Sequence, residues 1–354
     1  MPATPVPESG PAASESGSVC PACGEHGTEG AAYCEGCGAR LTGPTPEPAN
    51  AENPQTETAA DRGGARSCPS CGAAGAVGGD GYCIECGMLA TRERDHIEID
   101  ASTPGLPAAA VTDRGLRHHR NEDAVWLVTR PRCGDVVVAD GVSSSFDPDV
   151  ASALAVETAG TILGQDTGPA VVTRAIAAAA AAVAALASEG DPRRRTSNPA
   201  CTIVAATVRD GVITCGWAGD SRAYWVPDSG EAAQLTTDDS WVTAAIRQGT
   251  DPAAAWADRR AHAITAWLGA DAGTVDPHVT SLTPAGPGLL VVCSDGLWNY
   301  LTGLAEFAAA VREHAGRAAG GPAPMLALTR SLTEYAVASG GQDNITVAVL
   351  RLGG

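Results

Sequence analysis

An apolar run rich in β-branched residues, 136–139, ends directly on Asp140 and Gly141. Such a run predicts a short strand that is covered on both faces, with the Asp140 carboxylate at the point where the sheet meets solvent. Two further acids adjoin apolar runs in the same way, since Asp295 follows one run and Asp343 shortly precedes another. Three carboxylates at strand ends, far apart in the sequence, indicate a place where acidic side chains converge on metal ions.

The N-terminal part holds a second pattern, a Cys-x-x-Cys-Gly motif that occurs four times. The cysteine pairs are Cys20 and Cys23, Cys34 and Cys37, Cys68 and Cys71, and Cys83 and Cys86. Each motif forms a turn that directs two thiolates at one point, and two such turns complete a tetrahedral zinc site with four cysteine ligands. The sequence therefore predicts two zinc-ribbon modules, each with one structural Zn²⁺ that supplies most of its folding energy.

Two other uses of these cysteines are disulfides and redox chemistry. Disulfides are typical of secreted proteins, but the residues after Met1 include neither the basic nor the apolar segment of a signal peptide. A redox-active pair normally lies at a strand–helix junction, which is not expected here. No uninterrupted apolar stretch reaches the length of a membrane span, and the longest is the alanine-rich 175–187. We expect a cytoplasmic protein with metal-bound cysteines and no membrane partner.

Length and charge restrict the function further. The chain has 354 residues, of which 44% are hydrophobic, so it can form a large core with appended modules. Its net charge of −18 should repel the phosphate backbone of nucleic acids. A zinc ribbon that binds nucleic acid is therefore disfavoured, and protein docking or a purely structural role is the better hypothesis for both ribbons.

Composition divides the chain into segments. Stretches rich in proline, serine, glycine and glutamate predict disorder, whereas the alternating apolar runs in the second part predict one large domain. The expected organisation is disorder over residues 1–19, a first zinc ribbon over 20–42, a disordered linker over 43–66, a second zinc ribbon over 67–90, a linker over 91–107 and the large domain over 108–352.

Within the large domain, helical periodicity alternates with strand-like runs. We expect helices over 149–163, 174–187, 304–315 and 322–339, short helices within 240–268, and strands over 124–128, 136–139, 201–208, 211–218, 221–226, 275–282, 288–293 and 345–352. The segment that starts at residue 111 is expected to be a polar turn. Short connections imply mainly antiparallel pairing. The predicted fold class is α+β, an α-β-β-α sandwich of two mainly antiparallel sheets flanked by helices.

Several acidic motifs follow one another along this domain. They are Asn121-Glu122-Asp123, Ala139-Asp140-Gly141, Gly219-Asp220-Ser221-Arg222, and Ser294-Asp295-Gly296 together with Gln342-Asp343-Asn344. A single Asp-Gly pair would be uninformative, but the ordered set closely resembles the metal-dependent PPM (type 2C) protein serine/threonine phosphatases over residues 108–352. The resemblance implies hydrolysis of phosphoserine and phosphothreonine in proteins. The partners that it implies are phosphorylated proteins, among them a Ser/Thr kinase or its targets. We expect a monomer.

The resemblance also implies two Mg²⁺ or Mn²⁺ ions held between these motifs. Asp140 would bridge both ions, the Gly141 carbonyl would bind one of them, and Asp295 and Asp343 would hold the other. Asp220, together with Asp295, would match a weaker third metal site. Oxygen ligands of this kind suit Mg²⁺ and Mn²⁺ better than zinc.

Further residues have implied roles in the reaction. Glu122 would act through a metal-bound water, Asp123 would lie behind it, and Asn344 would orient the neighbouring ligand. Two ions about 4 Å apart can clamp a phosphoryl group and lower the pKa of a bridging water to roughly 7. The implied step is therefore attack of a metal-bridging hydroxide on phosphorus, without a side-chain nucleophile.

The sequence departs from the family pattern at two positions. His118 stands where many members have an arginine that binds the substrate phosphate, so the phosphate would be held by Arg117, by Arg120 or by protonated His118. Val142 stands where some members have a histidine that acts as a general acid, so His118, His119 or a metal-bound water would protonate the leaving group. These departures keep a second hypothesis open, an inactive scaffold that recruits phosphoproteins through its ribbons.

Overall fold

The computed structural model describes residues 67–68, 71–78, 82–87, 90, 92–165, 168 and 170–353. The chain divides into two units, Met1–Gly64 and Ala65–Gly354, and all of the described residues belong to the second unit. The predictions of disorder over 1–19 and 43–66 and of a first zinc ribbon with Cys20, Cys23, Cys34 and Cys37 lie outside the described residues.

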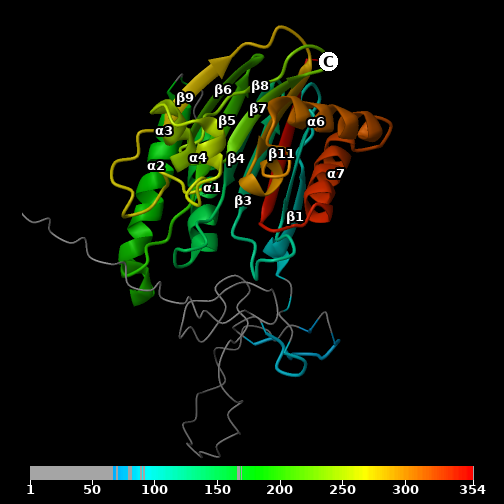
Figure 1. Cartoon of the computed structure of the whole chain (residues 1–354). Coiled ribbons are helices and arrows are strands. Elements are labelled where there is room, and N and C mark those ends of the chain that lie inside the picture. Colours follow the sequence, from blue (N-terminus) through cyan, green and yellow to red (C-terminus); the bar gives the residue numbers. More distant parts are fainter. Residues whose placement is uncertain are drawn as a thin grey trace, which may run out of the picture. The chain divides into compact units, whose positions relative to one another are not determined.

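The described part of the chain is built on two antiparallel sheets (Figure 1). One sheet has the strand order β1 (His96–Asp100), β2 (Ala108–Asp113), β11 (Ile345–Leu352), β10 (Gly288–Cys293), β7 (Arg222–Pro227) and β8 (Ala233–Gln234). The other has the order β3 (Ala124–Arg130), β4 (Cys133–Ala139), β5 (Ile203–Arg209), β6 (Val212–Ala218) and β9 (His278–Leu282). Every pairing between neighbours in either sheet is antiparallel.

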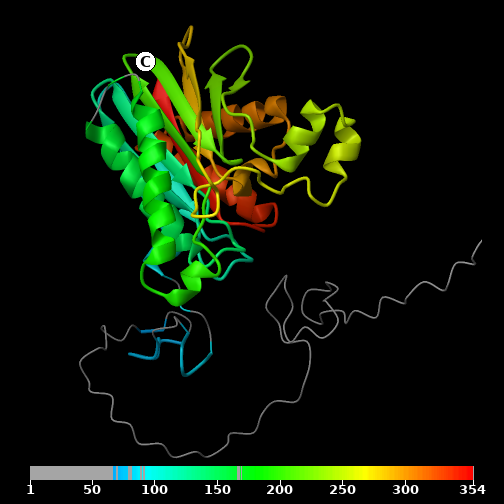
Figure 2. The same cartoon turned by 90° about the vertical axis from the view of Figure 1, so that its left-hand side faces the viewer.

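Helices cover the outer face of each sheet, as Figure 1 shows. The five-stranded sheet is covered by α1 (Pro148–Gln165) and α2 (Val171–Ala185), and the six-stranded sheet by α6 (Leu304–Ala318) and α7 (Pro324–Ala338). Shorter helices are α3 (Trp241–Arg247), α4 (Pro252–Trp256), α5 (Asp295–Trp298), and the 3₁₀ turns η1 (Glu93–Asp95), η2 (Leu186–Ser188) and η3 (Pro192–Arg195). Figure 2 shows α3 and α4 standing to one side of the sheets. The predicted α-β-β-α sandwich is confirmed.

Strand β4 explains why the sandwich forms. Its side chains at Val136 and Val138 belong to the core between the two sheets, whereas Val137 and Ala139 pack beneath α1 and α2. All four residues are fully buried, as the unbroken apolar run predicts for a strand covered on both faces. The apolar run therefore ends where strand β4 ends, and Asp140 is the next residue.

The expected linker over 91–107 is partly wrong, because this segment contains η1 and the edge strand β1. Strand β1 pairs with β2 from His96↔Asp113 to Asp100↔Ala109. Strand β2 itself is buried and lies between β1 and β11, although the sequence predicts a polar turn from residue 111. Three of the six residues of β2 are alanine, which has a low β-propensity, so its conformation comes from long-range pairing and not from local preference.

The sequence predicts no segment long and apolar enough to cross a membrane, but one helical segment among the described residues, Val171–Ser188, has that length and composition. Its buried face, with Val172, Ile176 and Val183, packs into the cluster formed with α1 and the five-stranded sheet. The apolar character of this segment is therefore used in the packing of the domain.

Candidate active site

The strands bring their acidic ends to one edge of the sandwich. In the register of the sheets, Ala139 lies opposite Ala124, Cys293 lies opposite both Arg222 and Val347, and Ile345 lies opposite Asp113. The residues just beyond these strand ends therefore meet, and they include Glu122, Asp123, Asp140, Asp220, Asp295 and Asp343. The acids predicted from the apolar runs thus lie at the same end of the sandwich, and their role as metal ligands stays a prediction.

The carboxylates at this edge affect one another electrostatically. Burial raises the pKa of Asp140 well above its usual value, and the negative charges of Asp123, Asp295 and Asp343 raise it further. Burial also raises the pKa of Asp295, followed by repulsion from Asp343 and Asp220. Such a group of carboxylates destabilises the fold at neutral pH unless bound protons or positive charge neutralise it.

Asp123 is buried beneath this cluster and joins three strands. Its Oδ2 accepts hydrogen bonds from the Oγ of Ser294 and from the Oγ1 of Thr346, each at 2.7 Å. Burial raises the pKa of Asp123 to about 6. Because Ser294 precedes Asp295 and Thr346 lies in β11, Asp123 ties the ends of β3, β10 and β11 together.

Asn344 holds the loop that carries Glu122. Its Oδ1 accepts the backbone N–H of Glu122 at 2.8 Å, and its Nδ2 donates to the carbonyls of Arg114 at 2.8 Å and Arg120 at 2.9 Å. The sequence suggests that Asn344 orients Asp343, and its backbone N–H donates to Asp343 Oδ1 at 2.8 Å. The three side-chain bonds show that Asn344 also anchors the loop over residues 114–122.

The Glu122 side chain is held by a residue that the sequence did not single out. The Oγ of Ser143 donates to Glu122 Oε2 at 2.6 Å, and burial raises the pKa of the Glu122 carboxyl. Gly141 lies against the same loop, since a Cβ at this position would lie 2.8 Å from the Glu122 carbonyl oxygen and 2.7 Å from that of Pro148. Only glycine fits there. The Ser143 contact joins two acidic motifs and could be found only from the fold.

The three candidates for holding the substrate phosphate have different surroundings. His118 faces the acids, with its Nε2 3.1 Å from Asp343 Oδ1 and its Nδ1 3.9 Å from Glu122 Oε2. Arg120 lies 3.6 Å from Asp149 Oδ1 at the start of α1. Arg117 is exposed and forms no ion pair with another described residue.

Asp220 lies beside a buried ion pair. Arg222 donates from Nε and Nη2 to the two carboxylate oxygens of Asp238, at 2.8 and 2.6 Å, and its guanidinium lies 3.5 Å from the ring centre of Trp298. Arg222 is thus a structural partner of a nearby acid. Burial, followed by the charge of Asp238, raises the pKa of Asp220 to about 7.

The acidic residues fit the divalent ions that the sequence implies. Oδ1 of Asp123 and Oδ1 of Asp295 are buried and accept no hydrogen bond from a described residue. No three acidic side chains in the described ranges have ligand atoms within 4.8 Å of one another. Carboxylate oxygens that are not used in hydrogen bonds are the kind of ligand that Mg²⁺ and Mn²⁺ take.

A second candidate metal site is formed by Cys68, Cys71, Cys83 and Cys86, whose sulfurs all lie within 4.8 Å of one another. Two of the sulfur pairs are 3.7 Å apart. Four sulfurs at about 2.3 Å around a tetrahedral zinc ion would be separated by about 3.8 Å. The second predicted ribbon therefore brings its four cysteines together with spacings that fit Zn²⁺.

Comparison with known proteins decides the family. The family described as Protein phosphatase 2C matches residues 115–330, which is more than half of the chain. The chain belongs to the protein phosphatase 2C family. This membership agrees with the order of the acidic motifs and makes the chain a phosphoprotein phosphatase by class. A comparison with curated protein sequences gives no match.

Solved structures of bacterial members of the phosphatase family share this fold. The Mycobacterium tuberculosis serine/threonine phosphatase PstP is 25% identical, with a TM-score of 0.58 over 70% of this chain and 99% of that chain. The Mycobacterium smegmatis PPM Ser-Thr phosphatase MsPP, solved with cacodylate, is 29% identical, with a TM-score of 0.54 over 70% and 98%. A structure of the PstP catalytic domain contains two manganese ions, at 25% identity, a TM-score of 0.54 and coverage of 70% and 98%.

Proposed function

We propose that this chain is an active Mg²⁺- or Mn²⁺-dependent phosphatase that hydrolyses phosphoserine and phosphothreonine in proteins. The observation that carries the proposal is that Asp140, Asp295 and Asp343, from strand ends of both sheets, lie close enough for their charges to interact, in a protein phosphatase 2C domain. The two manganese ions in the PstP structure support the choice of metal.

The proposed ligands are the acids described above. Asp140 would contact both ions, Asp295 and Asp343 would hold one, the Gly141 carbonyl would hold the other, and Asp220 would serve a third, weaker position together with Asp295. When bound, the ions supply a hydroxide nucleophile at neutral pH and positive charge for the phosphoryl oxygens.

The remaining steps fall to side chains of the chain itself. Glu122, held by Ser143, is placed to accept a hydrogen bond from a water at the site, while the buried Asp123 fixes the strand ends. His118 is the candidate cation that faces the acids, and its protonated form can hold a phosphate oxygen. Val142 cannot donate a proton, so His118, His119 or a metal-bound water would protonate the leaving oxygen.

We further propose that the cysteine cluster binds structural zinc and that the first four cysteines form a second site of the same kind. Reduced, metal-bound cysteines are consistent with a cytoplasmic protein. The proposed partners are phosphorylated proteins, including a Ser/Thr kinase or its targets, and the proposed state is a monomer.

A catalytically inactive scaffold is the second candidate function. It is favoured by two residues, His118 in the position of a phosphate-binding arginine and Val142 in the position of a general acid. In this case the chain would still bind Mn²⁺ and phosphopeptides but would release no phosphate.

Metal dependence separates the two functions. The full chain, treated with EDTA and then desalted, should hydrolyse p-nitrophenyl phosphate only after Mn²⁺ or Mg²⁺ is returned, and Ca²⁺ or Zn²⁺ should not restore the rate. Full activity in excess EDTA would contradict the metal mechanism. Saturable Mn²⁺ binding without any turnover would favour the scaffold.

A further inference from the structure

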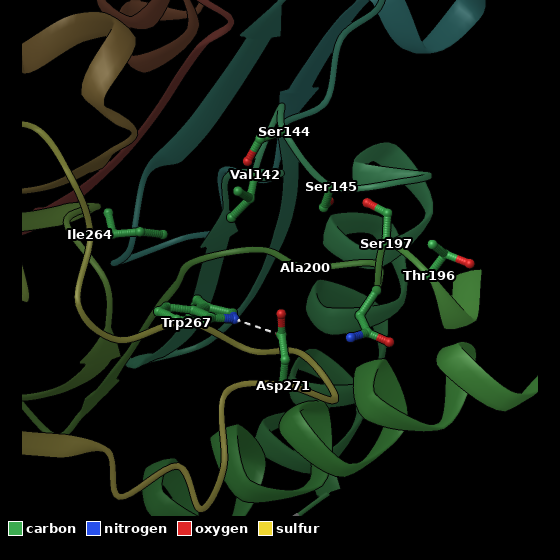
Figure 3. Close-up of a pocket in the computed structure, with 10 residues that line it drawn as sticks. Val142, Ser144, Ser145, Thr196, Ser197, Ala200, Ile264, Trp267 and Asp271 are labelled. Atoms are coloured by element: carbon green, nitrogen blue, oxygen red, sulfur yellow. Dashed lines mark hydrogen bonds between the residues drawn. The ribbon is translucent and has the colours of Figure 1, made fainter. Parts of the chain in front are cut away.

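A pocket opens beside the proposed metal site. It has a volume of about 380 Å³, and its lining comes from three segments of the chain: Val142, Ser144 and Ser145; Thr196, Ser197, Asn198 and Ala200; and Ile264, Trp267 and Asp271. Its wall includes Val142, which directly follows Gly141 of the proposed metal site, and the next residue, Ser143, donates to Glu122. Figure 3 shows these side chains around the opening.

The lining combines apolar side chains with hydroxyl groups and carries one charged side chain. Hydroxyl groups come from Ser144, Ser145, Thr196 and Ser197, and the one charged side chain in the lining is Asp271. Ser145 Oγ is buried and has no hydrogen-bond partner among the described residues. These groups can accept hydrogen bonds from a ligand that carries N–H donors.

One wall presents an aromatic ring and a carboxylate together. The indole Nε1 of Trp267 donates to Asp271 Oδ1 at 3.0 Å, as the dashed line in Figure 3 marks. Gly269 leaves room for this pair, since a Cβ there would lie 3.1 Å from Asp271 Oδ1 and 3.2 Å from Trp267 Cδ1. Asp271 forms no ion pair with a described residue, so its charge is available to a ligand.

The arginines of the neighbouring segment 193–195 do not pair with the Asp271 carboxylate. Arg193 pairs with Asp191 at 2.6 Å, and Arg194 pairs with Asp147 at 3.0 Å. Arg195 is exposed and is absent from the pocket lining. The pocket therefore keeps a net negative wall.

An indole ring beside a carboxylate is a receptor for a guanidinium or ammonium group, because the cation is attracted by both the ring face and the negative charge. We propose, on the basis of the phosphatase function proposed above, that Trp267 and Asp271 bind an arginine or lysine side chain of the substrate, close in sequence to the phosphorylated residue. The pocket would thus select basic phosphorylation sites.

Peptide kinetics test this selection. A set of phosphothreonine peptides places one arginine at each position from three before to three after the phosphothreonine, with an all-alanine reference peptide. At one or two of these positions, arginine should raise kcat/KM for the full chain with Mn²⁺ by about threefold to tenfold. Asp271→Asn, which keeps an acceptor for the indole, should remove most of this gain and leave hydrolysis of p-nitrophenyl phosphate unchanged.

Two further variants sharpen the test. Trp267→Phe keeps a ring but loses the indole hydrogen bond, so it should reduce the arginine gain in part. Asp276→Asn removes the same charge from a residue outside the lining and should keep the full gain. The proposal would be overturned if Asp271→Asn lowered kcat/KM equally for the arginine and alanine peptides. It would also be overturned if Asp276→Asn removed as much of the arginine gain as Asp271→Asn does.

A binding measurement separates this proposal from the phosphatase function. Fluorescence anisotropy of the labelled arginine and alanine peptides on the full chain should show several-fold tighter binding of the arginine peptide, and Asp271→Asn should remove the difference. If the arginine peptide binds more tightly but neither peptide is hydrolysed, the pocket proposal is supported and the proposed catalytic function is contradicted. Equal binding of both peptides would overturn the pocket even if the enzyme is active.

Discussion

The Oδ1 of Asn344 accepts the backbone N–H of Glu122 at 2.8 Å, although the two residues are 222 positions apart in the sequence. The same side chain donates to the carbonyls of Arg114 and Arg120. The residue just before β11 thereby fixes the loop that carries Glu122, one of the proposed site acids, and Asp343 lies at the adjacent position. One residue couples the position of this loop to the closing strand of the fold.

Replacement of Asn344 should therefore affect both stability and activity. Asn344→Ala removes three hydrogen bonds from a buried side chain, which should lower the free energy of unfolding by about 2–3 kcal/mol. Displacement of Glu122 should lower kcat for p-nitrophenyl phosphate by at least about tenfold. Thermal unfolding and steady-state rates measure the two effects. Gln342→Ala changes an exposed side chain nearby and should leave both close to wild type; equal effects of the two variants would contradict the role of Asn344.

Arg94 should support Asp123 from the segment before β1. It donates to the carbonyl of Asp149 at 3.0 Å and to the carbonyl of Asp123 at 3.2 Å. Arg94→Met keeps much of the side-chain volume but loses these bonds, so the free energy of unfolding in urea should fall by about 1–2 kcal/mol. Arg132→Met removes an arginine whose ion pair with Asp210 is exposed, and it should cost about 0.5 kcal/mol or less. A loss for Arg94→Met no larger than this control would contradict the prediction.

The acidic cluster should make the metal-free protein less stable as the pH rises. Burial raises the pKa of Asp123 to about 6 and that of Asp220 to about 7, whereas an aspartate in the unfolded chain titrates near about 3.9. Between these values the folded state binds more protons than the unfolded state, so stability is lost as the pH rises from about 4 to about 7.

Asp123→Asn measures this effect directly. In EDTA at about pH 7.5 the variant should be more stable than wild type by about 2 kcal/mol, and the difference should shrink towards zero at about pH 4.5. Urea unfolding at a series of pH values gives the two curves, and any loss of zinc to EDTA affects both proteins alike. A variant that is less stable than wild type at about pH 7.5 would contradict the raised pKa of Asp123.

The cysteine cluster should hold one zinc ion that depends on each of its members. Cys83→Ser should lower the zinc content of the full chain by about one ion per chain, measured by mass spectrometry of the metal. Cys133→Ser, a half-buried cysteine outside the cluster, should leave the zinc content unchanged. A chain purified without zinc, or an equal loss in both variants, would contradict a zinc site at these residues.

The sequence predicts some parts of the fold and of the acidic site but not others. Asp140, Asp295 and Asp343 were recognisable because each adjoins an apolar run, and the end of a buried strand is a local property of sequence. Strand β2 could not be recognised, since its alanines have no local preference for a strand and its conformation comes from pairing with β1 and β11.

The contacts that support the site are long-range, and local pattern does not reveal them. Ser143 reaches Glu122, and Ser294 and Thr346 reach Asp123, across segments that only the folded sandwich brings together. Trp267 and Asp271 are close in sequence, but their proposed role in binding a basic side chain depends on the pocket, to which the loop after Gly141 also contributes. Sequence thus predicts which acids form the site, and the structure shows which contacts position them.

The most direct measurement of the central claim is phosphate release from a phosphothreonine peptide by the full chain with Mn²⁺, compared with the Asp140→Asn variant. The variant should retain its circular dichroism spectrum and lose at least about a hundredfold in rate, because the proposed ions would lose the Asp140 carboxylate as a ligand. Asp210→Asn, at the exposed turn between β5 and β6, should keep the wild-type rate. An Asp140→Asn variant with more than about a tenth of the wild-type rate would contradict a metal-dependent phosphatase centred on Asp140.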